Sequence, residues 1–162
     1  LLGLIALTKL VKFFLFKIPA LRAELDKNKE LWRERRKLEK YPPVMKGTQT
    51  SGLAANVLFF VAICPWFVTL EPQSIGTIAL HVFVILMVYD FFYYLTHRFL
   101  FHGQGVWRKI HAVHHQARDP SFIDAHYVDW RETIMGMALF TGTIPLIGFF
   151  VGPFNVITLI LT

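Results

Sequence analysis

The residues best suited to chemistry in this sequence are histidines, and six of the seven lie between positions 97 and 126. The tightest group is HAVHH, at positions 111–115. Residues three and four apart share one face of a helix, so His111, His114 and His115 are expected to converge on one point or on two adjacent points. Neutral imidazole is the commonest metal ligand in proteins. The group predicts a metal site, with a polar patch against solvent or lipid headgroups as the alternative.

A second histidine pair precedes this group, in the stretch HRFLFH at positions 97–102. In an ideal α-helix five residues rotate by about 500°, which leaves His97 and His102 roughly 140° apart. The two can share a metal site only if the helix bends or unwinds between them, and Gly103 and Gly105 mark where it ends. Because HAVHH begins only nine residues later, the pair strengthens the prediction of a metal site.

Two further side chains in the apolar run before His97 have polar chemistry. Asp90 precedes His97 by seven residues, on the same helical face and about 10 Å away along the axis. Because an intramembrane carboxylate is costly and usually functional, we expect Asp90 to orient a ligand imidazole, with the capping of a polar pocket as the alternative. His81 is about 24 Å from His97 along the helix, too far for the same site. We expect His81 to be buried or to line a pocket.

The donor set narrows the choice of metal. An all-histidine site suits iron, copper, zinc or nickel. A structural zinc ion takes four ligands and a catalytic one three protein ligands, whereas this segment offers five or six histidines together with carboxylates. The number of donors is too high for one zinc ion and about half of what two iron ions would use. It favours a dinuclear site of which this segment supplies one part.

Long apolar runs must position these histidines. Of the 162 residues, 54% are hydrophobic, and a soluble domain of this size could not bury so much apolar surface. Residues 52–70 are uncharged and residues 75–96 are interrupted only by His81 and Asp90, and each run has roughly the 20 residues that a spanning helix needs. The sequence predicts an all-α integral membrane protein in which these two runs form a transmembrane helical hairpin.

Basic residues flank the predicted hairpin. Residues 21–50 hold nine Lys and Arg against five acids, and residues 97–133 carry five more, whereas the link at 71–74 has one charge, Glu71. Because Lys and Arg concentrate in cytoplasmic loops, we expect 21–50 to be a basic cytosolic segment and 97–133 a cytosolic histidine-rich helical cap. The net charge of +6 is then explained by attraction to anionic lipid headgroups, and nucleic acid is not expected as a partner.

Both ends of the chain continue the membrane pattern. Residues 1–20 are apolar but interrupted by three lysines, and they predict either an interfacial helix, which we favour, or a truncated membrane helix. Residues 134–162 predict the start of a second transmembrane hairpin, with a re-entrant hairpin as the alternative. Since there is no initial methionine and the last apolar run continues to the final residue, we expect residues 1–162 to be a single, incomplete membrane domain.

The stretches HRFLFH and HAVHH resemble the first two histidine boxes of the fatty acid hydroxylase/sterol desaturase superfamily. The neighbouring YDFFYYLTH, VWRKIH and HHQARDPSFIDAHYVDWRE fit its pattern, so the resemblance covers residues 86–133. It implies a membrane-bound non-haem di-iron enzyme that uses dioxygen to hydroxylate, demethylate or desaturate a fatty acyl chain or a sterol. It also implies five metal ligands: His97, His102, His111, His114 and His115.

The resemblance also implies cofactors and partners. Two iron ions would be bound, with zinc as the alternative in a purified form. Electrons would come from NAD(P)H through a redox partner such as cytochrome b5 and its reductase, or a ferredoxin. We expect a multi-pass protein of lipid or sterol metabolism in the endoplasmic reticulum membrane, which we favour over a bacterial inner membrane.

The sequence departs from the superfamily pattern in two places. The C-4 methyl sterol oxidases carry His-Pro-x-Glu where this chain has Asp-Trp-Arg-Glu at 129–132, and His126 and Asp129 are the candidates for that histidine's role, as an additional ligand or a supporting residue. Members of the cholesterol 25-hydroxylase kind also lack the His-Pro, which favours a hydroxylase. The third histidine box is absent from residues 1–162, so we expect this fragment alone to be inactive.

Two other functions remain open from the sequence. One is a non-enzymatic metal-binding membrane protein, with a zinc site or a role in metal transport, and the other is an inactive partial homologue. A transporter places its ligands near the bilayer midplane, where only His81 lies. The sequence therefore favours an oxygenase that hydroxylates or oxidises a lipid, and it does not reveal which residues bind the substrate.

Overall fold

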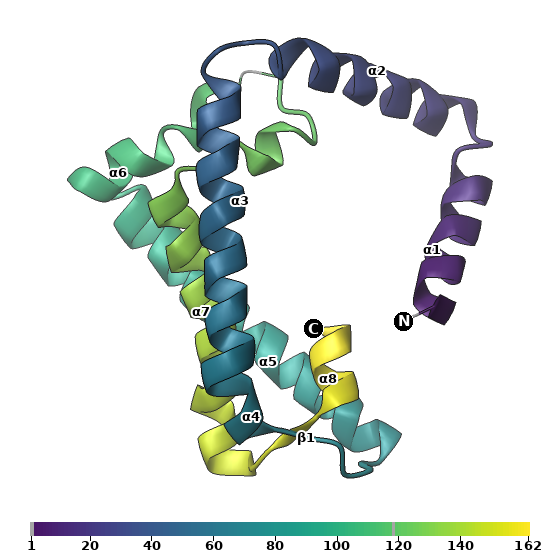
Figure 1. Cartoon of the computed structure of the whole chain (residues 1–162), viewed down its shortest axis with the longest axis vertical. Helices are drawn as coiled ribbons and strands as arrows, with labels where there is room; N and C mark the ends of the chain where they lie inside the picture. Colours follow the sequence, from purple (N-terminus) through teal and green to yellow (C-terminus); the bar gives the residue numbers. More distant parts are fainter. Residues whose placement is uncertain (1, 118) are drawn as a thin grey trace.

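Three long apolar helices form the body of the protein (Figure 1). The computed structural model describes residues 2–117 and 119–162. Helices long and apolar enough to cross a membrane run over Tyr41–Phe67, Ile75–Phe101 and Trp130–Val151. The third packs against both of the others. The predicted all-α membrane fold is confirmed.

The first span is one rod made of three pieces. They are α3 (Tyr41–Leu58), the π-helical turn η1 (Phe59–Ile63) and α4 (Cys64–Phe67). The rod begins earlier than the uncharged run 52–70 because Pro42 and Pro43 suit the first turn of a helix, where backbone N–H groups lack partners within the helix. Farther along, Pro65 cannot donate to a carbonyl of the preceding turn, and the helix widens into the π form there.

The other two spans begin at side-chain caps. The second consists of α5 (Ile75–Leu95) and the π turn η2 (Thr96–Phe101), and the third is α7 (Trp130–Val151). At the start of α5, Ser74 Oγ accepts the backbone N–H of Thr77 at 3.1 Å. At the start of α7, Asp129 Oδ1 accepts the backbone N–H of Arg131 at 2.9 Å. The third span ends at Gly152, whose φ of 85° favours glycine.

A small parallel ladder ties the spans together at the end far from the histidines. It consists of β1 (Val68–Thr69) and β2 (Phe154–Asn155). Asn155 Nδ2 also donates to the carbonyl of Glu71 at 2.7 Å. The chain then enters α8 (Val156–Leu161), which packs against α5. Residues 134–162 thus form most of one long helix followed by the short helix α8.

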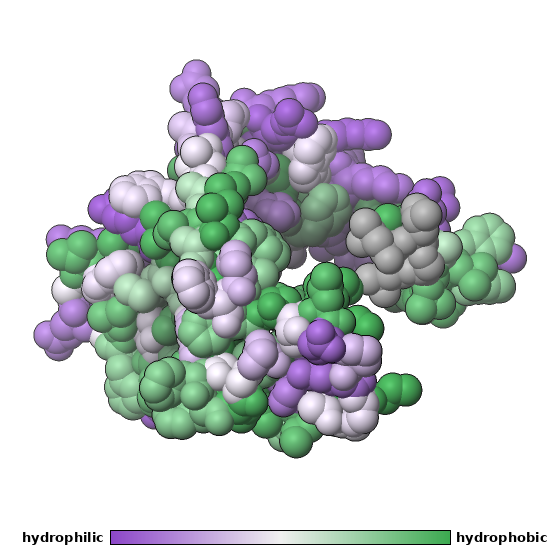
Figure 2. Space-filling model, turned by 60° about the horizontal axis from the view of Figure 1, so that its bottom comes forward, coloured by the Kyte–Doolittle hydropathy of each residue, from purple (hydrophilic) through white to green (hydrophobic). Residues whose placement is uncertain are grey.

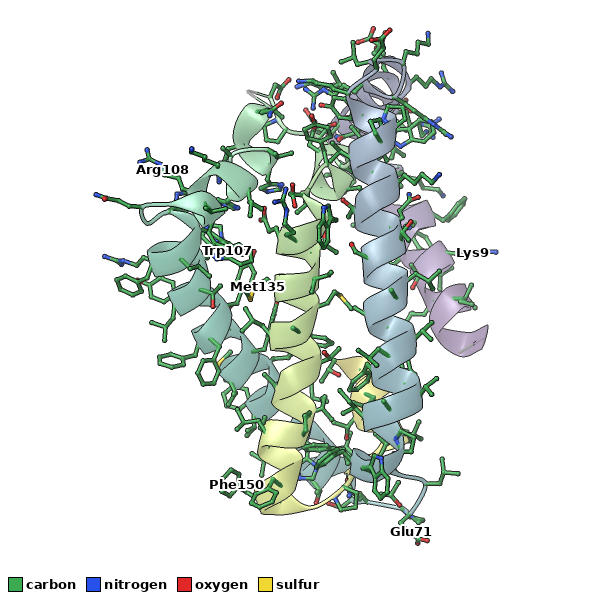
Figure 3. The ribbon with its side chains drawn as sticks, turned by 60° about the vertical axis from the view of Figure 1, so that its left-hand side comes forward. Lys9, Glu71, Trp107, Arg108, Met135 and Phe150 are labelled. Atoms are coloured by element: carbon green, nitrogen blue, oxygen red, sulfur yellow. The ribbon has the colours of Figure 1, made fainter. Side chains whose placement is uncertain are left out.

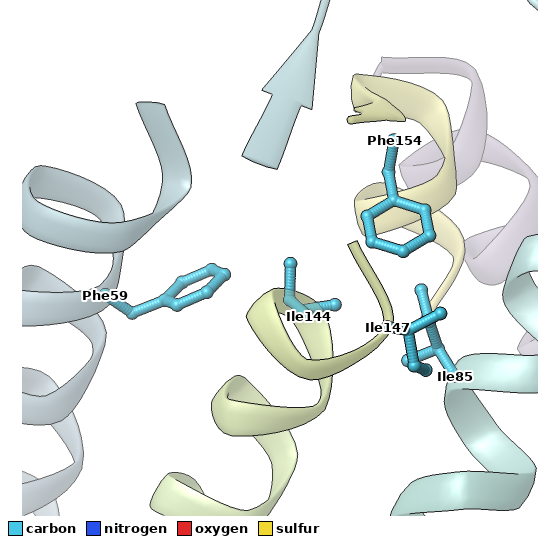
Figure 4. Close-up of a cluster of buried hydrophobic side chains, with 5 residues drawn as sticks. All are labelled: Phe59, Ile85, Ile144, Ile147 and Phe154. Carbon is cyan, nitrogen blue, oxygen red and sulfur yellow. The ribbon is translucent and has the colours of Figure 1, made fainter. Parts of the chain in front are cut away.

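Most of the apolar surface points outward. A core of five side chains joins the spans: Phe59, Ile85, Ile144, Ile147 and Phe154 (Figure 4). By contrast Trp66, Leu70 and Phe149 are 79%, 83% and 81% exposed. Hydrophobic residues also cover much of the face in Figure 2, whereas most hydrophilic ones lie along its top edge and a smaller group lies at the lower right. Such an apolar exterior suits lipid, and it supports the assignment to the membrane.

The histidine end carries a cap and an N-terminal arm. The cap contains α6 (Val106–His111) and the 3-10 turns η3 (His114–Gln116) and η4 (Asp124–His126). The arm consists of α1 (Leu2–Leu15) and α2 (Pro19–Arg35). In Figure 1, α2 extends sideways from the top of α3, on the side opposite α6, and α1 turns back down at a distance from the spans. With 14 residues α1 is about 21 Å long, shorter than a bilayer core, so its place at the interface remains a prediction.

A buried ion pair attaches the arm to the cap. The carboxylate of Asp124 is almost fully buried and accepts hydrogen bonds from the Arg35 guanidinium, the Tyr41 hydroxyl at 2.7 Å and the Ser121 backbone N–H at 2.8 Å. Arg35 also donates to the carbonyl of Asp119 at 2.5 Å. The end of α2 therefore holds the loop that connects the histidine segment to α7.

Candidate metal centre

The π turn η2 brings the first histidine pair together. The backbone N–H of His102 donates to the carbonyl of His97 at 3.0 Å, a step of five residues. Their Nε2 atoms lie 3.1 Å apart. His97 and His102 could share a site only if the helix unwound between them. The structure shows this unwinding as one π-helical turn, which is wider than an α-helical turn.

The second histidine group lies where one kind of helix changes into another. α6 ends at His111, and the 3-10 turn η3 begins at His114. The Nε2 atoms of His111 and His115 nevertheless lie 2.8 Å apart. His114 lies beside them, with its ring centroid 5.9 Å from that of His111, but outside the group of converging nitrogens.

The structure thus brings four of the five predicted ligands into one cluster. One nitrogen from each of His97, His102, His111 and His115 lies within 4.8 Å of all the others. Metal–nitrogen bonds of about 2.0–2.1 Å put the donors of a tetrahedral site about 3.3 Å apart, so the cluster is somewhat wider than one ion's ligand shell and its imidazoles would move inward to bind one ion. We call these residues the histidine cluster. Their donor chemistry fits iron or zinc.

Glu132 fixes the orientation of the most buried imidazole. Its Oε1 lies 2.7 Å from Nδ1 of His111, and the two residues are only 7% and 2% exposed. When the carboxylate accepts the Nδ1 proton, Nε2 of His111 is free to bind a metal. The ring of Phe101 stacks on the same imidazole with centroids 5.1 Å apart. The orienting role that the sequence suggested for Asp90 falls to Glu132.

The surroundings keep two imidazoles in the form that binds metal. Burial and the neighbouring His115 lower the pKa of His111 to about 4. Burial, followed by His115, also lowers the pKa of His114. Both side chains are therefore neutral at neutral pH, and neutral imidazole is the metal-binding form.

The remaining candidates lie away from the cluster. Asp90 is exposed and makes no hydrogen bond or ion pair with any residue in the described ranges. Asp129 caps α7 and pairs with Arg131 at 3.0 Å. His126 is exposed and faces a groove beside Trp32. His81 packs edge-on against Phe154, with ring centroids 5.0 Å apart.

Sequence reasoning gave Glu132 no role beyond its place in the family pattern. A signal for it existed, because Glu132 is an acid in the first turn of the third apolar run. A carboxylate within a membrane span is usually functional, and this holds for Glu132 as well as for Asp90. What the sequence lacked was the packing of α7 against α6, which brings Glu132 to His111.

A cavity of about 390 Å³ lies between the spans beside the cluster. His114 and Glu132 form its polar end, and Tyr89, Gly136 and Phe140 belong to its apolar wall. The arrangement can place a hydrocarbon next to metal-binding imidazoles. Figure 3 shows this middle region of α7, where Met135 is labelled, between the nitrogen-rich end near Arg108 and the opposite end near Glu71.

Fold and site together define an all-α integral membrane protein with a histidine cluster at one end of its spans. The model of the fatty acid hydroxylase family matches residues 82–162, half of the chain. The chain therefore belongs to the fatty acid hydroxylase family. The resemblance to the fatty acid hydroxylase/sterol desaturase superfamily is confirmed.

The chain is also similar, more distantly, to part of a plant protein. The very-long-chain aldehyde decarbonylase GL1-10 of Oryza sativa subsp. japonica is 39% identical to this chain over 74 residues. The matched segment covers 45% of this chain and 24% of the relative, so the chain matches about a quarter of that enzyme. No solved structure matches the chain.

Proposed function

We propose that this chain is part of a membrane-bound non-haem di-iron oxygenase that hydroxylates or oxidises a lipid, either a fatty acyl chain or a sterol. The histidine cluster beside an apolar cavity is the observation that carries the proposal. Family membership supports it. So does the similarity to the rice relative, which is named as a decarbonylase of very-long-chain aldehydes.

The five histidines supply only part of the proposed metal site. His97, His102, His111 and His115 would hold one iron ion, and His114 would contribute to a second. Two ions with four to six ligands each need more donors than five imidazoles, so we propose that residues 1–162 alone are inactive. Bound iron supplies the reduction of dioxygen that lipid oxidation requires.

The chain's own residues have distinct tasks in this proposal. Glu132 holds the proton at Nδ1 of His111 and thereby directs Nε2 toward the metal. Phe101 covers the ring of His111 and keeps water from it. The cavity would hold the lipid next to the histidine cluster and in a fixed orientation, which favours reaction over random collision.

We propose that the histidine end lies in the cytosol and that the enzyme resides in the endoplasmic reticulum membrane. The basic residues of α2 and the cap favour that orientation. NAD(P)H would supply electrons through cytochrome b5 and its reductase, which would meet the enzyme on the cytosolic side.

Incubation of the full-length protein in membranes with ¹⁸O₂, reduced pyridine nucleotide and candidate fatty acyl lipids or sterols tests the proposal. We expect ¹⁸O in a lipid product, with loss of that product in His111→Ala and its retention in His126→Ala. A complete lack of lipid oxidation by protein that has taken up its metal would overturn the proposal in favour of a non-enzymatic metal protein.

A further inference from the structure

We infer that the cavity beside the histidine cluster binds a long-chain lipid that carries a hydroxyl group, and that Gly136 keeps the space for its hydrocarbon chain open. The assignment of this lipid as a substrate rests on the proposed function, whereas its binding does not require iron or dioxygen.

The polar end of the cavity lacks a partner. Nδ1 of His114 and Oε2 of Glu132 are both buried without a hydrogen bond to any described residue, and both residues line the cavity. A buried polar atom without a partner costs about 1–3 kcal/mol. A hydroxyl group can donate to a carboxylate such as Glu132 and can accept from an N–H such as that of His114, so a ligand hydroxyl suits the chemistry of this end.

The apolar wall follows one face of α7. Glu132, Gly136 and Phe140 are spaced four residues apart, so they lie above one another on that face. The eight residue steps from Glu132 to Phe140 rise by about 12 Å along the helix. At the far end Phe140 contacts Tyr89 of α5 edge-on, with ring centroids 5.2 Å apart. A hydroxyl at Glu132 would therefore start a hydrocarbon chain that runs along α7 toward Phe140.

Gly136 is the open point in this wall. A Cβ atom added there would meet no atom within 4 Å. The space beside Gly136 is therefore the part of the cavity that a larger side chain would fill, and the absence of a side chain sets the width available to the lipid.

A second groove offers a matched comparison. It has a volume of about 370 Å³ and is lined by α3 and α7, with Gly142 in its wall. An added Cβ at Gly142 would also meet nothing within 4 Å. Its two hydroxyl groups, however, are already bonded to backbone carbonyls: Ser51 to Thr48, and Thr141 to Met137. It therefore lacks the unpartnered polar end of the first cavity.

The test uses the full-length protein in nanodiscs and a long-chain fatty alcohol with a photoactivatable diazirine in its chain. After illumination, mass spectrometry maps the labelled residues. We expect labels on the cavity wall, at Tyr89 and Met137. Gly136→Leu should reduce labelling about tenfold or more, because the added side chain fills the space of several methylene groups. The matched variant Gly142→Leu should leave it unchanged.

Two further arms keep the result decisive. Phe140→Ala should shift the preference toward longer alcohols, because it enlarges the far end of the cavity. This variant tests the inference even when Gly136→Leu does not fold. The methyl ether of the same alcohol should bind more weakly, because it cannot donate to Glu132. Labels at Ala54 and Ala138 that are lost in Gly142→Leu would overturn the inference, as would equal binding of alcohol and ether. Labelling without lipid oxidation would instead contradict only the proposed function.

Discussion

At the scale of single residues, the histidine cluster has a buried side and an exposed side. His111 is fixed by Glu132 and Phe101, and the ring of His97 lies 5.7 Å from that of Tyr93. His102 and His115 are exposed. The buried imidazoles are thus held in place before a metal binds, whereas the exposed pair faces the side from which an ion would enter.

The hydrogen bond between Glu132 and His111 should control metal affinity. In Glu132→Gln the negative charge that strengthens this bond is lost, and we expect metal affinity to fall about 10–100-fold, as is typical when the partner of a ligand histidine is changed. The measurement is competition for metal with a chelator of known affinity. Asp90→Asn is the matched control, because it removes another carboxylate from a span without touching the cluster. Equal affinities for the two variants would contradict the role of Glu132.

The low pKa of His111 predicts how the metal-free protein responds to acid. Its folded-state value of about 4 lies below the ordinary value of 6.5, so the unfolded chain binds more protons between these pH values. The stability of the metal-free protein should therefore decrease as the pH falls from about 6.5 to about 4. Thermal unfolding across this range tests the prediction, and His111→Phe should flatten the dependence. An unchanged slope in that variant would argue against it.

At the scale of elements, the π turn η2 is what makes a single site from two histidine boxes. Its end is closely packed against its own backbone, since a Cβ at Gly103 would lie 2.1 Å from the carbonyl oxygen of Phe99. Any other residue at Gly103 must push this turn apart and move His102.

Gly103→Ala should therefore lose metal binding and destabilise the protein by about 1–3 kcal/mol, the usual cost of overpacking. Metal content and thermal unfolding of the purified variant provide the measurement. Gly76→Ala is the control, because its added Cβ would meet only Ser74 Oγ at 3.8 Å. Full metal content in Gly103→Ala would show that the turn tolerates displacement.

The sequence predicted this site in part. Hydropathy predicted the spans and spacing grouped the histidines, because both depend on local periodicity. Spacing also showed that His97 and His102 could meet only where an α-helix is distorted, but the π turn itself depends on packing. Glu132 and the Arg35–Asp124 pair join segments far apart in the chain, which local periodicity cannot reveal. The exposure of Asp90 could not be predicted for the same reason, since packing decides which face of α5 turns outward.

At the scale of the whole molecule, the buried Arg35–Asp124 charge pair is a central contact between the N-terminal arm and the cap. Arg35→Leu would leave the Asp124 carboxylate buried without its cation, which typically costs about 3–5 kcal/mol. We expect a loss of that size in unfolding experiments, together with faster proteolysis of the loop around residues 119–124. Arg36→Leu should have a small effect, because Arg36 is exposed and stacks on Trp32. Similar losses in both variants would show that the pair does not hold the cap.

The arrangement of the whole molecule places the histidines where lipid and solvent meet. Apolar side chains cover the spans, and the charged cap lies at one end, so the proposed lipid could approach from the bilayer and a metal ion from the end with the cap. Metal analysis of the purified full-length protein tests this account most directly. We predict two iron ions per chain. Iron should be lost in His111→Ala and retained in His126→Ala. No bound metal, or a single zinc ion, would contradict this prediction.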